Sequence, residues 1–211
     1  MKSYTRSALI ALALANLFAF SGHAQPGGTS SLSWMTKDNN LKQIDGPAPD
    51  GQPAFRVYRS AAPSRQTFES WCKVYNIDRV IVLSGDAASY ELKYQAQGVC
   101  PGIKVIHNSF HRFDLPFQKS FLDWFDGAVA SAKNDKAGLL LRCITGSHRT
   151  GQLAAYYQLK YLNMSIDGVV KDMNNDGAAM PFFDLWMMPQ VRGLDAYVHN
   201  RPCSFPDACV R

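Results

Sequence analysis

The most constraining feature of the sequence is the stretch 138–151, in which an apolar run leads into a cysteine, a short loop and an arginine. The apolar run, 139–141, predicts a short buried strand, and residues 152–162 predict a helix. Cys143 follows the strand, and five residues separate it from Arg149. Backbone N–H groups in such a loop can form a concave nest around one anion, and the helix N-terminus adds partial positive charge. The stretch therefore predicts a phosphate-binding loop that carries a nucleophilic thiol.

Several residues of this loop have predicted roles in binding phosphate or in activating the thiol. The planar guanidinium of Arg149 can bind two phosphate oxygens at once. The same positive field stabilises a thiolate, so we expect the pKa of Cys143 to lie below that of a free thiol. Gly146 allows the backbone to approach closely, while the side chain of His148 either adds a donor or faces solvent. The predicted phosphate-binding residues are Ile144, Thr145, Gly146, Ser147, His148 and Arg149.

The stretch resembles the signature of the cysteine-based protein tyrosine phosphatases, written His-Cys-x5-Arg-(Ser/Thr), and in particular their dual-specificity branch. The residues that match are Cys143, Gly146, Arg149, Thr150 and Gly151. Residues 58–64, Tyr-Arg-Ser-Ala-Ala-Pro-Ser, are similar to a Tyr-Arg-Ser-x-x-Pro-Ser segment of bacterial dual-specificity-like phosphatases. The resemblance covers residues 56–173 and implies a phosphocysteine intermediate, formed without a metal or an organic cofactor. It also implies that Thr150 donates a hydrogen bond to the departing thiolate.

One position departs from that signature, because Arg142 precedes the cysteine where the family has histidine. The family histidine helps to position the loop and to keep the thiolate, and Arg142 can supply positive charge instead if it points inward. The departure leaves a catalytically silent phosphoryl-binding domain as an alternative. Two further alternatives are a buried cysteine in an ordinary loop and a rhodanese-like sulfur carrier, although loops of that second kind resemble a shorter Cys-x4-Arg spacing.

A phosphatase of this kind also needs an acid that protonates the leaving oxygen. The resemblance places this acid on a mobile loop before the helix that precedes the cysteine strand. Asp114 lies there, between a predicted strand over 104–110 and a predicted helix over 121–132, and the Leu-Pro pair after it favours a loop. Asp123 and Asp126 are the alternatives, but both lie on the polar face of the predicted helix.

Along the rest of the chain, predicted strands and helices alternate. This order predicts a single α/β domain with a central, mostly parallel sheet flanked by helices on both faces. In such folds the ligand lies at the carboxyl ends of the strands, which is where Cys143 falls. The predicted strands are 55–59, 79–83, 104–110 and 139–141, and the predicted helices are 68–75, 86–97, 121–132, 152–162 and 166–173.

Residues 1–24 have the organisation of a secretory signal peptide. A basic start precedes an apolar run over 8–20, and small residues predict cleavage after Ala24. The run is shorter than the roughly 20 residues of a membrane span, although an uncleaved anchor is the alternative. We expect an exported, periplasmic or secreted protein without stable membrane insertion after cleavage. An irregular N-terminal arm over 25–52 then precedes a phosphatase domain over 53–211.

The sequence contains five cysteines, and an odd number in an exported protein indicates disulfide pairs plus one free thiol. If Cys143 is the nucleophile, the other cysteines can form two disulfides. The simplest pairing joins those nearest in sequence, Cys72 with Cys100 and Cys203 with Cys209. Spacing alone leaves the connectivity open.

The formal net charge is +5, and two of the positive charges, Lys2 and Arg6, lie in the predicted leader. This mild excess suits an anionic substrate, and the chain has no basic run of the kind that nucleic-acid-binding proteins use. We expect a protein phosphorylated on tyrosine, or on serine or threonine, as the first substrate class and an inositol polyphosphate or phosphoinositide as the second. The lysines common in phosphoinositide-type loops are absent here, where Arg142 and His148 are basic.

Other residues with chemical potential are predicted to be structural. Residues 172–177 begin like a calcium loop, but Phe183 stands where a bidentate glutamate is needed, so we predict a helix end and a turn. No cysteine or histidine pair has zinc spacing. We expect the aromatic-rich run 182–188 in the core. Structural or surface positions are predicted for His107, His111 and His199.

Overall fold

Five strands form one sheet, in the spatial order β1-β2-β5-β3-β4. Strand β1 runs antiparallel to β2, and the other neighbouring pairs are parallel, so the predicted mostly parallel sheet is confirmed. Strand β5 lies at the centre, where a parallel strand is covered on both faces and reads as a continuous apolar run. The strands are β1 (Lys42–Asp45), β2 (Arg56–Ser60), β3 (Ile77–Val82), β4 (Lys104–Asn108) and β5 (Gly138–Arg142).

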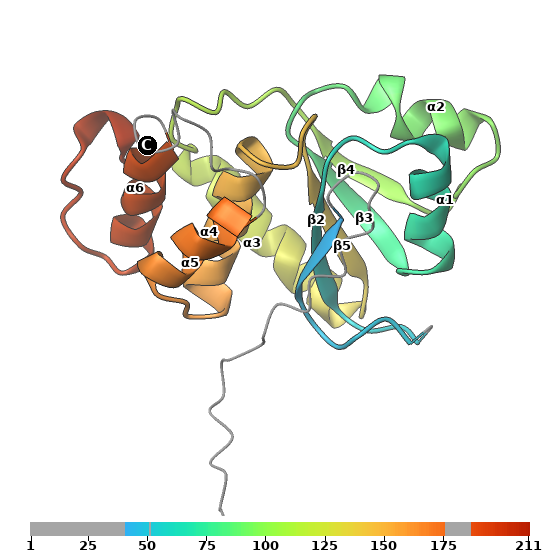
Figure 1. The fold of residues 1–211 in the computed structure, drawn as a ribbon, viewed down its shortest axis with the longest axis horizontal. Coiled ribbons are helices and arrows are strands. Elements are labelled where there is room, and N and C mark those ends of the chain that lie inside the picture. The colour runs from blue at the N-terminus through green and yellow to red at the C-terminus, as the bar shows by residue number, and fades with distance from the viewer. Residues whose placement is uncertain (1–40, 51, 176–186) are drawn as a thin grey trace, which may run out of the picture.

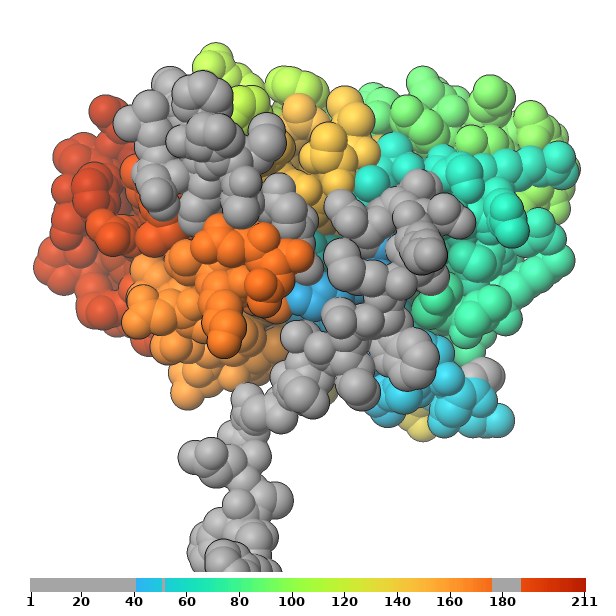
Figure 2. All heavy atoms as spheres, viewed as in Figure 1, coloured from blue at the N-terminus to red at the C-terminus, as the bar shows by residue number. Residues whose placement is uncertain are grey.

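The computed structural model describes residues 41–50, 52–175 and 187–211. Helices within these ranges lie on both sides of the sheet, as predicted (Figure 1). One side carries α1 (Arg65–Lys73) and α2 (Glu91–Ala96). The other side carries α3 (Lys119–Asn134), α4 (Arg149–Tyr161), α5 (Ile166–Met173) and α6 (Met188–Val198). In the space-filling view, α1 and α2 lie at the opposite end of the molecule from the red C-terminal residues (Figure 2).

Alternate residues of β5 face two separate hydrophobic cores. Leu139 and Leu141 belong to the core that includes Phe125 of α3 and residues of α4, α5 and α6. Leu140 belongs to the core on the other side, with Trp71 of α1. All five β5 residues are buried. Because packing on both faces fixes this strand, its carboxyl end is a rigid support for the loop that follows.

Three elements differ from the sequence prediction. The arm expected to be irregular contains β1, whose four residues are too few for a clear alternation, although Leu41 and Ile44 are buried. The helix predicted over 86–97 is divided at Tyr90, which leaves the helical conformation, into the 3₁₀ turn η1 (Ala87–Ser89) and α2. Helix α6 has no counterpart among the predicted helices. The predicted leader and residues 25–40 of the arm lie outside the described residues.

Both predicted disulfides are present, Cys72–Cys100 and Cys203–Cys209, and Cys143 is the free cysteine. The first disulfide joins α1 to the turn after α2. The second closes a loop that holds the 3₁₀ turn η4 (Pro206–Ala208) against α6. This packing is close, because a Cβ added to Gly193 would lie 2.0 Å from a backbone carbonyl oxygen of η4.

The first carboxylate of the calcium-like stretch is already engaged. Asp172 accepts hydrogen bonds from Lys42 Nζ (2.5 Å) and Gln158 Nε2 (2.5 Å). Helix α5 ends at Met173, as expected, and the stretch beyond residue 175 is not described, nor is most of the aromatic-rich run 182–188. Within the described ranges, no group of three or more His, Cys, Asp or Glu residues is placed to hold a metal ion, and no helix is both long and apolar enough to cross a membrane.

Candidate active site

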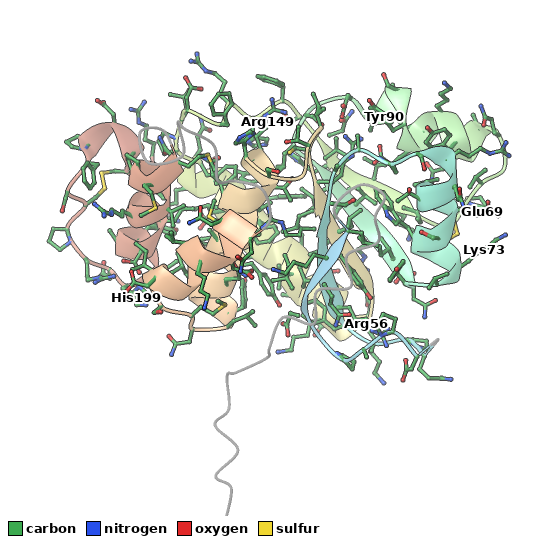
Figure 3. All side chains as sticks on the ribbon, in the orientation of Figure 1. Arg56, Glu69, Lys73, Tyr90, Arg149 and His199 are labelled. Carbon is green, nitrogen blue, oxygen red and sulfur yellow. A yellow bond between two sulfur atoms is a disulfide. The ribbon has the colours of Figure 1, made fainter. Side chains whose placement is uncertain are left out.

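The carboxyl end of β5 leads directly into the predicted phosphate loop. Cys143 follows the strand and is only 2% exposed, and the loop 144–148 leads to the start of α4 at Arg149. Parallel ladders to β2 and β3 fix the end of β5 on both sides. Arg149 lies at the end of the sheet that is formed by the carboxyl ends of the parallel strands (Figure 3). The structure thus brings the thiol, the loop and the arginine together at the carboxyl ends of the strands, where ligands bind in such sheets.

The loop rests on the segment that follows β2. Gly146 has a φ of +76°, which side chains of L-residues rarely adopt. A Cβ at this position would lie 2.7 Å from both the Ser60 carbonyl carbon and the Ala61 nitrogen. The Ala62 N–H donates to the Ile144 carbonyl at 3.0 Å. The Tyr-Arg-Ser segment that carries part of the family resemblance therefore supports the loop directly.

Hydrogen bonds around the sulfur favour its thiolate form. Burial raises the pKa of the Cys143 thiol, but these hydrogen bonds outweigh burial and leave the pKa below the ordinary thiol value. The donors are the hydroxyl and N–H of Thr150 and the N–H groups of Gly146 and Thr145, and the Gly146 nitrogen lies 3.3 Å from Sγ. The buried Thr150 hydroxyl has no other hydrogen-bond partner in the described part of the chain, which leaves it available to the sulfur.

The guanidinium of Arg149 is arranged to receive an anion. Its Nε and Nη1 atoms are buried and have no hydrogen-bond partner among the described residues. A buried donor without a partner is costly, and an oxyanion above the loop can supply an acceptor to one edge of the guanidinium, since arginine favours bidentate binding of such oxygens. The ring of Phe110 covers the group, with its centroid 4.7 Å from Cζ. Arg149 is therefore held in place without being neutralised.

The pocket over the sulfur is small and has an apolar rim. Its volume is about 160 Å³, and it is lined by Phe113, Cys143, Ile144, Thr145, His148 and Arg149. Among these lining residues Arg149 is the permanent cation, because burial and the neighbouring Arg149 lower the pKa of His148. Large hydrophobic side chains nearby are unusually exposed, namely Phe110 at 62%, Ile144 at 52% and Phe113 at 42%. This rim suits an aromatic group better than a second phosphate.

Asp114 is not among the described residues that line this pocket. The preceding residue, Phe113, lines the pocket, whereas Asp114 lines a separate cavity of about 410 Å³ with residues of the C-terminal loop. Arg112 binds the carboxylate through Nε (3.0 Å) and Nη2, and this hydrogen bonding lowers the pKa of Asp114. An ionised carboxylate in this position cannot donate a proton above Cys143. The predicted acid role therefore requires the loop to turn.

Neither alternative carboxylate takes the place of Asp114. Asp123 and Asp126 lie on α3, as predicted. Asp123 pairs with Lys119 at the surface, and Asp126 accepts hydrogen bonds from the Tyr156 hydroxyl at 3.1 and 3.0 Å. The described residues that line the pocket include no carboxylate.

Arg142 supplies no free charge to the phosphate loop. Its side chain is fully buried on the α2 side of β5. Glu91 binds Nε (2.6 Å) and Nη2, while the Asp86 carboxylate and Ser84 Oγ (2.9 Å) bind Nη1. The Tyr90 ring lies over the guanidinium, with its centroid 5.4 Å from Cζ. The position that holds histidine in the family is here a buried ion pair that ties β5 to η1 and α2.

Replacement of Arg142 by methionine should reduce the free energy of unfolding by about 3–5 kcal/mol, because it leaves the Glu91 carboxylate buried without its partner. The further change Glu91→Leu should restore much of this loss, since it removes the uncompensated charge. Urea unfolding of the single and double variants measures both effects.

The matched control is Lys73→Met, which breaks the exposed Lys73–Glu69 pair of α1 (Figure 3). Exposed ion pairs contribute little, so this change should have a much smaller effect. If Arg142→Met and Lys73→Met destabilise the protein equally, the buried ion pair does not have the structural role described above.

His107 and His111, which show no partner spacing in the sequence, form a pair in the structure. Their Nε2 atoms lie 2.9 Å apart, and their rings pack against Phe121. Burial, His107 and the charge of Arg149 together lower the pKa of His111 to about 4. The two residues belong to the end of β4 and the loop after it, where an i, i+4 spacing carries no signal, so sequence reasoning could not find this contact.

No protein-family model matches the sequence, and no curated protein matches it significantly. Several solved structures are similar. TpbA of P. aeruginosa has a TM-score of 0.52 at 19% identity, over 71% of this chain and 88% of that chain. Tk-PTP in its active form has a TM-score of 0.50 at 18% identity, over 75% and 95% of the two chains. PTPMT1 in complex with PI(5)P has a TM-score of 0.52 at 11% identity, over 76% and 97%.

These similarities concern the fold alone, which this chain shares with TpbA, Tk-PTP and PTPMT1. The fold that the loop signature implies is thus confirmed. The similar structures were solved with different phosphate esters, TpbA with pTyr and PTPMT1 with PI(5)P. The choice of substrate therefore has to come from the residues of this chain.

Proposed function

We propose that the protein is an exported, cysteine-dependent phosphatase that hydrolyses phosphate monoesters through a phosphocysteine intermediate, with phosphotyrosine as the preferred substrate class. The observation that carries the proposal is Arg149, which lines the same pocket as the stabilised thiolate of Cys143 and whose buried Nε and Nη1 atoms have no hydrogen-bond partner among the described residues. Export is supported by the predicted leader and by the two disulfides, which persist in oxidising compartments.

In the first step, Cys143 Sγ attacks phosphorus in line with the leaving oxygen, so that an S–P bond forms as the P–O bond breaks. The loop N–H groups and Arg149 hold the three equatorial oxygens, over which the charge of the transition state is spread. Asp114 gives its proton to the leaving oxygen after its loop has turned the carboxyl group into the pocket. The products of this step are the free alcohol or phenol and the phosphocysteine.

In the second step, water attacks the phosphorus of the phosphocysteine. The S–P bond breaks as the new P–O bond forms, and Asp114 accepts the proton of the water. The sulfur leaves as a thiolate, which the hydroxyl of Thr150 and the N–H groups of the loop stabilise. Inorganic phosphate is released, and both Cys143 and Asp114 return to the states in which they began.

The proposed preference for phosphotyrosine rests on the depth of the pocket and on the apolar residues around its rim. Cys143 lies on the floor of the pocket and is 2% exposed, so the phosphate of a long side chain reaches it more easily than that of serine. Phe110, Phe113 and Ile144 offer apolar surface for an aromatic ring. A polyphosphate would need several cations, whereas Arg149 is the permanent cation among the described lining residues.

Three matched substrates test the proposal: a phosphotyrosine peptide, the same peptide with phosphoserine, and inositol hexakisphosphate. We expect kcat/KM to be at least about tenfold higher for the phosphotyrosine peptide, a difference of about 1.4 kcal/mol in the barrier. Phe113→Ala should reduce this advantage, whereas Val74→Ala, which truncates an exposed apolar residue next to α1, should not. Faster hydrolysis of the inositol phosphate would assign the site to polyphosphates, and phosphate binding without any hydrolysis would indicate a silent domain.

A further inference from the structure

Arg59, near the end of β2, binds the underside of the phosphate loop. Its side chain is buried, with 2% of the residue exposed. The Nη2 atom donates a hydrogen bond to the Gly146 carbonyl at 2.7 Å and lies 3.5 Å from the Ser147 carbonyl oxygen. The loop thus rests on a buried cation from the neighbouring strand, and the proposed mechanism gives this cation no role.

Peptide geometry connects these contacts with the anion site. In a trans peptide, the C=O of one residue and the N–H of the next point in opposite directions. The bond from Arg59 to the Gly146 carbonyl therefore directs the Ser147 N–H away from Arg59. The Ser147 carbonyl also accepts the Gly151 N–H of α4 at 3.1 Å, so the helix and Arg59 together direct the His148 N–H. The Ser147 nitrogen lies 3.5 Å from Thr145 Oγ1, a long contact that an oxyanion oxygen can replace.

A second support comes from the same segment of the chain. The N–H of Ala62 donates to the Ile144 carbonyl at 3.0 Å, which leaves the Thr145 N–H directed at Cys143 Sγ. Residues 59–62 therefore hold three loop carbonyls outward, away from the anion. The alternation of outward carbonyls and inward N–H groups is what an anion nest requires.

We infer that Arg59 is a positioning residue that sets the phosphate affinity of the loop, because it holds the Gly146 carbonyl outward and so aims the N–H group of Ser147 at the oxyanion. This inference rests on the proposed function, since phosphate is the ligand that the loop is proposed to bind. A guanidinium suits the task, because it donates to two acceptors in one fixed plane and keeps its charge at every physiological pH.

Arg56 provides a matched control on the same strand. It is also buried, at 0% exposed, and it also binds backbone carbonyl oxygens, those of Pro47, Ala48 and Gln52. It lies at the opposite end of the sheet from Arg149 (Figure 3). Loss of either arginine removes a buried side chain and its hydrogen bonds to backbone carbonyls, so both changes should destabilise the fold. Of the two arginines, Arg59 is the one that contacts the phosphate loop.

The test measures binding of inorganic phosphate by calorimetry. Every variant carries Cys143→Ser, so that the reactive thiolate is absent and binding alone is measured. Arg59→Met should raise the Kd for phosphate at least about tenfold. Arg59→Lys, which keeps the charge but lacks the planar fork, should bind with intermediate affinity. Arg56→Met should leave the Kd within about twofold of the parent, although its melting temperature falls. If Arg59→Met does not fold, the comparison of Arg59→Lys with Arg56→Met decides.

The outcomes separate this inference from the proposed function. If the parent binds no phosphate, the proposed function itself is wrong. If the parent binds phosphate and the Arg59 variants bind it equally well, the inference is overturned while the proposed function stands. The inference is also overturned if Arg56→Met weakens binding as much as Arg59→Met does, because the effect would then follow from general loss of stability.

Discussion

Replacement of Cys143 by serine should lower the turnover of an activated aryl phosphate by on the order of 10⁴-fold or more, while phosphate still binds. The hydroxyl of serine is much less acidic than a thiol, so it stays protonated, and no carboxylate among the described lining residues is placed to accept its proton. The amide loop and Arg149 remain, so the affinity for phosphate should change by less than about threefold. Steady-state hydrolysis and calorimetry give the two quantities.

The wild-type enzyme should also yield a trapped phosphocysteine. Acid quenching during turnover, followed by mass analysis of the peptide that contains Cys143, should show one added phosphoryl group on that residue. The Cys143→Ser variant should show none. Turnover by this variant above about one tenth of the wild-type rate, a loss of only about 1.4 kcal/mol of barrier stabilisation, would rule out the phosphocysteine mechanism.

Replacement of Asp114 by asparagine should cost about 10²–10⁴-fold in kcat/KM for phosphotyrosine, but much less for an ester with a good leaving group. A tyrosine oxyanion is basic and needs a proton as it leaves, whereas an activated phenol does not. Deprotonation of Asp114 should also produce the basic limb of the pH–rate profile, so this limb should flatten in the variant. A series of aryl phosphates with rising leaving-group pKa measures both effects.

Two control variants make this prediction specific. Asp123→Asn removes a surface carboxylate that is paired with Lys119 and should have little effect. His148→Gln tests the titratable side chain that already lies in the pocket. A loss that is equal for every leaving group in Asp114→Asn, or a leaving-group dependence that appears in His148→Gln instead, would remove Asp114 from the acid role and leave the roles of Cys143 and Arg149 unchanged.

The local parts of this site could be predicted from the sequence because their signals are local. The apolar run of β5, Cys143, the loop and the start of α4 lie within a few turns of chain, and each is written in residue type and spacing. The two disulfides could be predicted because the fifth cysteine, Cys143, was already assigned as the nucleophile, which left four cysteines to form two pairs. The mostly parallel sheet could be predicted from the alternation of strands and helices. Its buried central strand could be predicted from an unbroken apolar run.

The parts that could not be predicted depend on contacts between distant segments. Glu91 and Asp86, which bind Arg142, lie 51 and 56 positions before it, and nothing in their local sequence identifies them as its partners. Arg59 reaches the Gly146 carbonyl across 87 positions. The orientation of Asp114 is set by Arg112, two residues away, but exposed loop pairs of this kind are too weak to read from sequence.

Cys143 shares its chain with two disulfides, and the burial of its sulfur determines which oxidants can attack it. Exchange with another disulfide requires a second sulfur atom to approach in line, and a cavity of about 160 Å³ with a 2% exposed cysteine admits no sulfur carried on a folded protein. A molecule the size of hydrogen peroxide can enter, and a thiolate is the form that it oxidises. The folded chain should therefore separate two kinds of sulfur chemistry by size, because a thiol on a folded protein cannot reach Cys143 whereas a small diffusible oxidant can.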